Sequence, residues 1–150
     1  MPINHSNHPT FNIKWLHALL LTAKYHGIGQ NRSLAHSDVD PHALHIPSRR
    51  YPTSIFSALL SHLTTLSKNP NFVTLAAETT QPRMLGSIGF VMTTATTLLD
   101  AYQMLSDYFP PIFDGITLKI SHEQQNCILS LQNYEADAMV NEFFIACLLS

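Results

Sequence analysis

Apolar residues recur along most of this chain with the 3.6-residue period of an amphipathic helix. The pattern predicts helices over residues 11–26, 52–66, 72–80, 84–92, 98–109 and 137–149. Gly27 is well placed to end the first helix, and Pro52 suits the first turn of the second. The sequence between them, residues 28–51, is expected to form a long polar connection, because Pro41 and Pro47 exclude a continuous helix.

Two glycines mark the helix predicted over residues 84–92. Gly86 and Gly89 lie three residues apart and so share one helical face. Each glycine in a helix costs roughly 1 kcal/mol relative to alanine, so the pair predicts that a neighbouring backbone approaches this face closely. A polar run then breaks the helix. Thr97 and Asp100 have the spacing of a capping box, which predicts the start of the next helix.

The period changes from 3.6 to two in the last third of the chain. Ile116, Leu118 and Ile120 alternate with polar residues, which is typical of a half-buried strand. A turn over residues 122–126 and an antiparallel partner over 127–132 complete a predicted hairpin. An isolated hairpin is marginally stable, so sequence beyond this chain is expected to complete the sheet. The predicted fold is α+β, a helix-rich domain with a small antiparallel sheet.

A series of short motifs follows along the chain in a fixed order. It consists of Gly27-Ile28, Arg50-Tyr51-Pro52, the joint Leu66-Ser67-Lys68-Asn69-Pro70, Pro82, Gly86-x-x-Gly89-Phe90, Thr97-Leu98-x-Asp100-Ala101 and the aromatic Tyr108. In order and spacing, the series resembles the effector-binding N-terminal domain of AraC-type bacterial transcription regulators, in the branch called arabinose-binding. The resemblance covers roughly residues 15 to 150. It departs from the family at Lys68-Asn69, where Gly-Asp is usual.

The resemblance implies a regulatory sensor domain. Such a domain binds a small effector, forms a homodimer and controls a C-terminal helix-turn-helix domain that contacts DNA. The alternative is a dimerisation or interaction module of the same regulator that binds no ligand. Residues 1–10 are expected to be a flexible lead, and residues 11–150 the sensor domain. The chain stops inside an apolar helical pattern and contains nothing that resembles a helix-turn-helix, so we expect a truncated regulator.

Composition narrows the possible partners. The formal charge is −2 and only 12% of the residues are charged, so no basic face is available for direct contact with nucleic acid. A surface with so few charged residues is expected to be covered in part by a partner. No apolar run approaches the ~20 residues that cross a membrane, and the N-terminus lacks the pattern of a signal peptide. The sequence therefore predicts a cytoplasmic protein without a membrane partner.

Histidine is the over-represented polar residue type. The nine histidines are densest in the segment 36–45, where His36, His42 and His45 alternate with Asp38 and Asp40. Imidazoles and carboxylates at such separations could close around Zn²⁺. Runs of this kind in loops are usually solvated, however, and neither a cysteine pair nor a helical His-x-x-x-His supports this one. The sequence therefore predicts no metal site.

No arrangement typical of catalysis is recognisable. The chain has no nucleophile elbow, no cysteine set beside a base, no paired carboxylates on a helical face and no phosphate-binding glycine loop. Cys127 and Cys147 lack a metal-type spacing and are expected to be reduced thiols. We therefore expect a protein that is not an enzyme and carries no cofactor.

Aromatic and methionine side chains gather around the joint of the two helices predicted between residues 82 and 113. Such side chains can line an apolar pocket in which a hydroxyl orients a small ligand. The candidate effector-binding residues are Phe90, Met92, Tyr102, Tyr108 and Phe109, with His62 or Thr93 as a polar partner. The alternative is that they are core, since helical stripes usually face the interior. The scarcity of amides and acids favours a fatty, aromatic or amino-acid-derived effector over a sugar.

Overall fold

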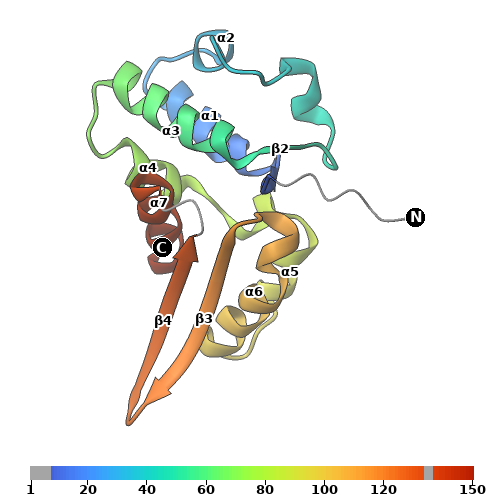
Figure 1. Ribbon diagram of the computed structural model, residues 1–150, viewed down its shortest axis with the longest axis vertical. Coiled ribbons are helices and arrows are strands. Elements are labelled where there is room, and N and C mark those ends of the chain that lie inside the picture. Colours follow the sequence, from blue (N-terminus) through green and yellow to red (C-terminus); the bar gives the residue numbers. More distant parts are fainter. Residues whose placement is uncertain (1–7, 134–136) are drawn as a thin grey trace.

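The computed structural model describes residues 8–133 and 137–150, and it confirms the helix-rich α+β fold (Figure 1). In chain order the elements are β1 (Thr10–Asn12), α1 (Trp15–Tyr25), α2 (Gln30–Ser33), the 3-10 helix η1 (Pro41–His45), β2 (Arg50–Pro52), α3 (Thr53–Ser67), α4 (Phe72–Thr79), the 3-10 helix η2 (Pro82–Leu85), α5 (Ser87–Thr93), α6 (Leu98–Ile112), β3 (Ile116–Glu123), β4 (Asn126–Asn133) and α7 (Ala138–Leu149).

Four helices and an aromatic core form the body of the domain. Helix α7 packs against α4 and α3, and α1 packs against α3 and α4. Figure 1 shows α1 beside α3 and α7 beside α4. Between them lie fully buried phenylalanine rings that meet edge to face, with centroids 4.8 Å apart for Phe113 and Phe144 and 5.2 Å apart for Phe56 and Phe143. Edge-to-face pairs stabilise a core beyond the area that they bury.

A short antiparallel ribbon of β1 and β2 ties the N-terminal part of the chain to the end of α6. Phe11 lies opposite Tyr51 in this ribbon and also forms a bridge to Phe113. The side chain of Asp114 accepts hydrogen bonds from the Thr10 amide and hydroxyl and lies 3.5 Å from the Arg50 guanidinium. These contacts join three segments that are far apart in the sequence.

The predicted helix over residues 11–26 begins later than expected. Residues 10–12 form β1. The side-chain oxygen of Asn12 then accepts a hydrogen bond from the backbone amide of Lys14 at 3.0 Å, and the chain turns before Trp15. Residues 1–7 of the expected lead lie outside the described residues. The carbonyl of Pro9 accepts the amide of Thr53, so the end of that lead is part of the fold.

The polar connection predicted over residues 28–51 contains local structure that the sequence analysis did not anticipate. It includes α2, η1 and the first two residues of β2. The η1 turn is capped by Asp40, whose carboxylate accepts the amide of His42 at 2.9 Å. Elements this short have too few residues for a hydrophobic period, which explains why they were missed.

The predicted hairpin is confirmed and is longer than expected. Strands β3 and β4 pair from Ile116 opposite Asn133 to Glu123 opposite Asn126. The predicted turn over 122–126 is therefore reduced to two residues, of which Gln124 has a φ of +54°. The hairpin packs through β3 on α6, and its tip points away from the helices (Figure 1).

The glycine-marked segment is built differently from the single helix that was predicted. Gly86 has a φ of +71° and separates η2 from α5, so it is not inside a helix. Gly89 does lie in α5, and a Cβ placed there would come within 1.6 Å of the Pro82 carbonyl oxygen. The predicted close approach of a backbone is therefore confirmed at Gly89. Helix α6 begins with the predicted cap, in which Thr97 accepts the amide of Asp100 at 3.1 Å.

Candidate functional site

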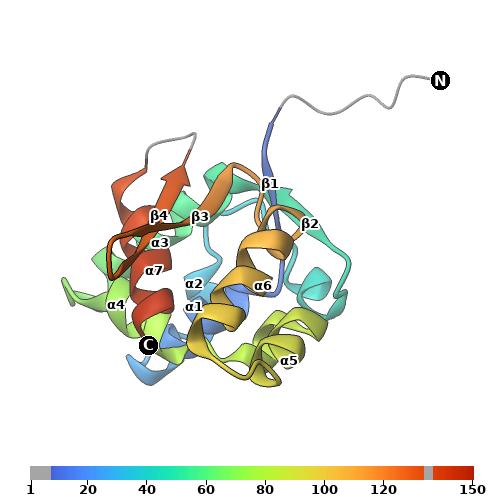
Figure 2. The same ribbon diagram turned by 90° about the horizontal axis from the view of Figure 1, so that it is seen from below.

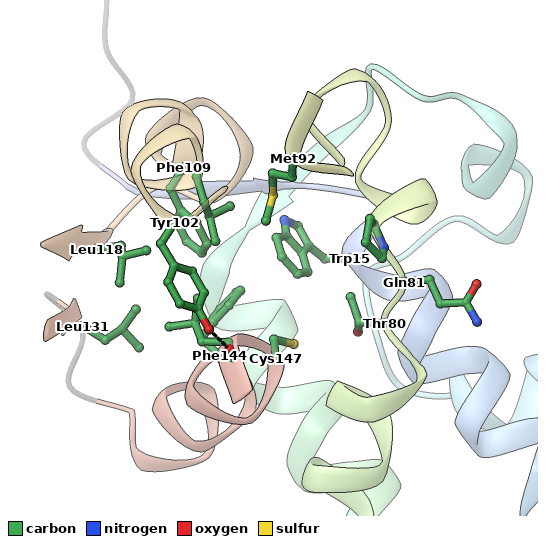
Figure 3. Close-up of a pocket in the computed structure, with 13 residues that line it drawn as sticks. Trp15, Thr80, Gln81, Met92, Tyr102, Phe109, Leu118, Leu131, Phe144 and Cys147 are labelled. Atoms are coloured by element: carbon green, nitrogen blue, oxygen red, sulfur yellow. Dashed lines mark hydrogen bonds between the residues drawn. The ribbon is translucent and has the colours of Figure 1, made fainter. Parts of the chain in front are cut away.

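An apolar pocket lies where α1, α6, the β3–β4 hairpin, α7 and the η2–α5 segment meet. We call it the central pocket, and its cavity measures about 90 Å³. In the view of Figure 2, α6 and α7 flank the position of α1, whose first residue, Trp15, lies between them. The lining residues are Trp15, Thr80, Gln81, Pro82, Met92, Tyr102, Leu105, Phe109, Leu118, Leu131, Phe144, Cys147 and Leu148 (Figure 3).

Each wall of the central pocket follows from a local sequence pattern. On α6, Tyr102, Leu105 and Phe109 are spaced three and four residues apart, which places them on one helical face. On the hairpin, Leu118 and Leu131 are cross-strand partners, so their side chains share one face of the two strands. The most exposed lining residues are Gln81 and Pro82, which therefore mark the mouth of the pocket.

The polar side chains of the central pocket are few and mostly engaged with backbone. The hydroxyl of Tyr102 donates to the carbonyl of Leu148, as the dashed line in Figure 3 shows. The hydroxyl of Thr80 donates to the Ala76 carbonyl at 3.1 Å. None of the lining residues that the structure describes is Asp, Glu, Lys, Arg or His. The pocket therefore presents an apolar, uncharged surface.

Cys147 adds a thiol that stays protonated. Burial raises the pKa of Cys147 to about 12, and a hydrogen bond with the Thr80 side chain opposes that rise only in part. The sulfur lies 3.8 Å from the carbonyl oxygen of Ala77, to which the thiol donates. A thiol rather than a thiolate is present at neutral pH, so Cys147 acts as a small apolar wall and not as a nucleophile.

The structure brings three of the predicted effector-binding residues together in the central pocket. They are Met92 on α5 and Tyr102 and Phe109 on α6. Phe109 is buried against Trp15 and Phe144, with ring centroids 6.1 Å and 5.3 Å away. The methionine is half-buried and closes the pocket from the α5 side.

The remaining predicted site residues lie elsewhere. Phe90 is 71% exposed and Tyr108 is 57% exposed, so neither side chain faces the pocket or the core. His62 lies on α3, where its Nε2 is 3.3 Å from the carbonyl oxygen of Arg32. Thr93 is exposed, and its hydroxyl donates to the Phe90 carbonyl. These four side chains are therefore not part of the lining of the central pocket.

Most of the pocket lining was missed by sequence reasoning. The missed residues are Trp15, Thr80, Gln81, Pro82, Leu105, Leu118, Leu131, Phe144, Cys147 and Leu148. Several of them belong to the apolar faces of predicted helices, but the sequence pattern of one helix does not predict which other element that face will contact. On α7, the sequence feature that could have indicated the pocket-facing side is an aromatic residue followed by a cysteine one turn later, namely Phe144 and Cys147.

The histidine-rich segment does not form a compact cluster. His36 has a φ of +64° and is exposed, and His42 and His45 lie in or at the end of η1 with exposed side chains. Among the described residues, no group of three His, Cys, Asp or Glu side chains is placed to hold a metal ion. The convergence that a metal-responsive domain would require is therefore not found there.

Two other hollows are larger and more open than the central pocket. One, of about 510 Å³, lies between α1 and η1 and is lined in part by His17, Lys24 and His45. The other, of about 390 Å³, lies between α3 and the segment that follows α2, and includes Asp38 and His62. Both are open to solvent and lack the apolar enclosure that small-molecule sites usually have.

Residues 27–150 match the protein family described as the N-terminal arabinose-binding domain of AraC transcription regulators. The match covers more than half of the chain, so the chain belongs to this family of regulatory, ligand-binding domains, which is not an enzyme family. No curated protein matches the chain. Over the part of the chain that the structure describes, no helix is long and apolar enough to cross a bilayer.

Proposed function

We propose that this domain senses a small effector in the central pocket and thereby controls the DNA-binding domain of an AraC-type regulator. The observation that carries the proposal is the apolar, uncharged cavity between α6 and α7 in a domain whose family binds ligands. Apolar enclosure with a few convergent polar groups is the usual form of a small-molecule site.

The position of α7 suggests how binding is transmitted. Helix α7 is the last element of the chain and contributes Phe144, Cys147 and Leu148 to the pocket wall. An effector that contacts these side chains favours one position of α7 over another. A ligand shifts a conformational equilibrium by its difference in affinity for the two states. Helix α7 is therefore the proposed relay of effector binding.

A thermal-shift screen against small metabolites, with Zn²⁺ and EDTA included, tests the proposal. A ligand that binds only the folded state raises the unfolding midpoint by mass action. We expect a saturable shift with at least one metabolite. It is abolished by Tyr102→Ala and retained by Tyr108→Ala, which changes the exposed tyrosine of the same helix. If no metabolite shifts the midpoint of the folded domain, the sensor function is rejected.

The second candidate is the dimerisation module that binds no ligand. It is favoured by exposed apolar side chains at the α5–α6 joint, where Phe90 and Leu98 are 71% and 69% exposed. Exposed apolar side chains that gather on one part of a surface often mark an interface. Sedimentation velocity of the wild type and of the double variant Phe90→Ser/Leu98→Ser tests this candidate. A concentration-dependent dimer that the double variant loses supports it, and a monomer at all concentrations contradicts it.

A further inference from the structure

The indole nitrogen of Trp15 is a buried donor without an acceptor. Trp15 is 3% exposed and lines the central pocket, and among the described residues its Nε1 has no hydrogen-bond partner. Figure 3 shows the nitrogen-bearing edge of the ring turned toward Met92, across the cavity. A buried donor that loses its partner costs on the order of 1–3 kcal/mol, so such groups are normally satisfied. This donor is therefore placed to bind an acceptor that enters the pocket.

The neighbouring polar groups do not supply that acceptor. The hydroxyls of Tyr102 and Thr80 donate to the carbonyls of Leu148 and Ala76, respectively, and neither hydroxyl oxygen accepts from Nε1. Much of the remaining lining is aliphatic or aromatic. A water molecule at Nε1 would need two to four polar partners, and a lining made mostly of apolar side chains offers it few. An acceptor carried by the effector itself is the better match.

Resting on the proposed sensor function, we infer that the effector is a compact, uncharged and largely apolar molecule whose single carbonyl-type oxygen accepts the Trp15 Nε1–H. A ketone, ester or lactone attached to one ring or a short chain has this chemistry. The cavity of about 90 Å³ holds only part of such a molecule, and the rest of the molecule extends toward the mouth at Gln81.

Charged and polyhydroxylated ligands fit this lining poorly. A carboxylate would be buried with no Lys, Arg or His among the described residues of the wall, and an unpaired buried charge is strongly unfavourable. A pentose would bury several hydroxyl groups against Phe109, Leu118 and Phe144, which cannot accept or donate. The inference therefore departs from the sugar in the family's description.

Acetophenone and ethylbenzene are a matched pair of probes for this inference. They share a ring and differ mainly in that only acetophenone has a carbonyl oxygen. Calorimetric titration of the 150-residue chain is expected to show about tenfold tighter binding of acetophenone, because one satisfied donor is worth that much. Trp15→Phe keeps an aromatic ring and removes the N–H. In that variant the two probes are expected to bind equally, with the affinity for ethylbenzene changed less than threefold.

The wild-type protein offers a second readout that needs no variant. Trp15 is the only tryptophan, so a ¹⁵N-labelled sample gives one indole N–H resonance. Acetophenone is expected to move that resonance downfield by hydrogen bonding, and ethylbenzene is not. L-Arabinose, the third probe, is expected to cause neither heat nor a change of this resonance.

The outcomes separate this inference from the sensor function on which it rests. Equal affinity of the two aromatic probes for the wild type, or no binding of either at millimolar concentration, overturns the inference. Saturable binding of L-arabinose that Tyr102→Ala abolishes also overturns it, while supporting the sensor function. Tighter binding of acetophenone with a moved indole resonance establishes Trp15 as the anchoring donor.

Discussion

The hydroxyl of Tyr102 performs a structural task at the end of α7. The last carbonyls of a helix lack intrahelical amides, and Leu148 carries one of them. By donating to that carbonyl, Tyr102 links α6 to the C-terminal turn of α7 at the wall of the pocket. This polar contact adds to the apolar contact between the same two helices, in which the Phe109 and Phe144 ring centroids lie 5.3 Å apart.

Removing this hydroxyl is expected to destabilise the domain. Tyr102→Phe deletes one hydrogen bond to a part-buried carbonyl, so the free energy of unfolding should fall by about 1 kcal/mol. Tyr108→Phe is the matched control, because Tyr108 lies on the same helix with its side chain 57% exposed. Urea denaturation measures both. Equal values for the two variants would contradict the structural role of the Tyr102 hydroxyl.

The two cysteines are expected to differ strongly in reactivity. Cys127 is exposed at the hairpin, whereas burial raises the pKa of Cys147 to about 12. Because the thiolate is the reacting form, a disulfide reagent at pH 8 should label one thiol quickly and the second only on unfolding. Cys127→Ser should abolish the fast phase. A fast phase that survives in this variant would show that Cys147 is accessible and ionised.

The same pKa gives a pH dependence of stability with a definite sign. The ordinary pKa of the thiol is 9.0 and the folded value is about 12, so between these values only the unfolded state has released the proton. The stability contributed by the neutral thiol is complete below pH 9 and is lost as the pH rises toward 12. The difference in free energy of unfolding between wild type and Cys147→Ala should therefore fall above pH 9. A difference that stays constant to pH 11 would contradict the raised pKa.

Helix rotation explains which predicted site residues reached the pocket. Residues advance about 100° each around an α-helix, so Phe109, seven residues after Tyr102, returns to the same face. Tyr108, six residues after Tyr102, is turned away by roughly 120° and is exposed. The period could therefore have excluded Tyr108. The helical period of α6 could not have predicted that Trp15 lines the pocket, because the start of α1 comes to lie against α6 only in the folded chain.

At the scale of elements, the η2–α5 segment depends on a glycine. The Pro82 carbonyl occupies the space that a side chain at Gly89 would need, so α5 lies directly on η2. This packing holds Pro82 and Met92 in the pocket wall. The segment therefore acts as a cover whose position follows from a backbone contact rather than from a buried apolar face.

Gly89→Ala is expected to displace this cover. The added Cβ would lie 1.6 Å from the Pro82 carbonyl oxygen, so α5 or η2 must move, at a cost of about 1–3 kcal/mol in stability. Gly29→Ala is the control, since a Cβ there meets nothing within 4 Å and its φ is −69°. Hydrogen exchange should speed up in residues 82–93 of the first variant only. Unchanged exchange there would show that the contact is not needed to hold the segment.

Elements with a sustained period were predictable, and those that depend on distant partners were not. The stripe of α3 and the alternation of β3 identify their elements from local sequence alone. Strands β1 and β2 have three residues each, and their pairing across the chain has no local signature. The break at Gly86 was missed because its positive φ, and not a polar residue, separates η2 from α5.

For the whole molecule, one aromatic core joins the body of the domain to its pocket. Phe144 contacts Trp15 in the pocket wall and Phe56 and Phe113 in the centre of the body, with ring centroids between 4.8 and 6.1 Å away. Pocket and core therefore share side chains rather than occupying separate regions. Loss of packing in one should be felt in the other.

We therefore expect one cooperative unfolding transition. Indole fluorescence reports only on Trp15, whereas far-ultraviolet circular dichroism reports on all helices, and the two curves should coincide. Phe144→Leu should shift both midpoints equally, by a loss of about 1–2 kcal/mol, because it removes part of a fully buried ring at the junction. The exposed Phe90→Leu should leave both unchanged. If Phe144→Leu moved the fluorescence curve alone, the pocket would melt independently of the body, and effector binding could not stabilise the domain as a whole.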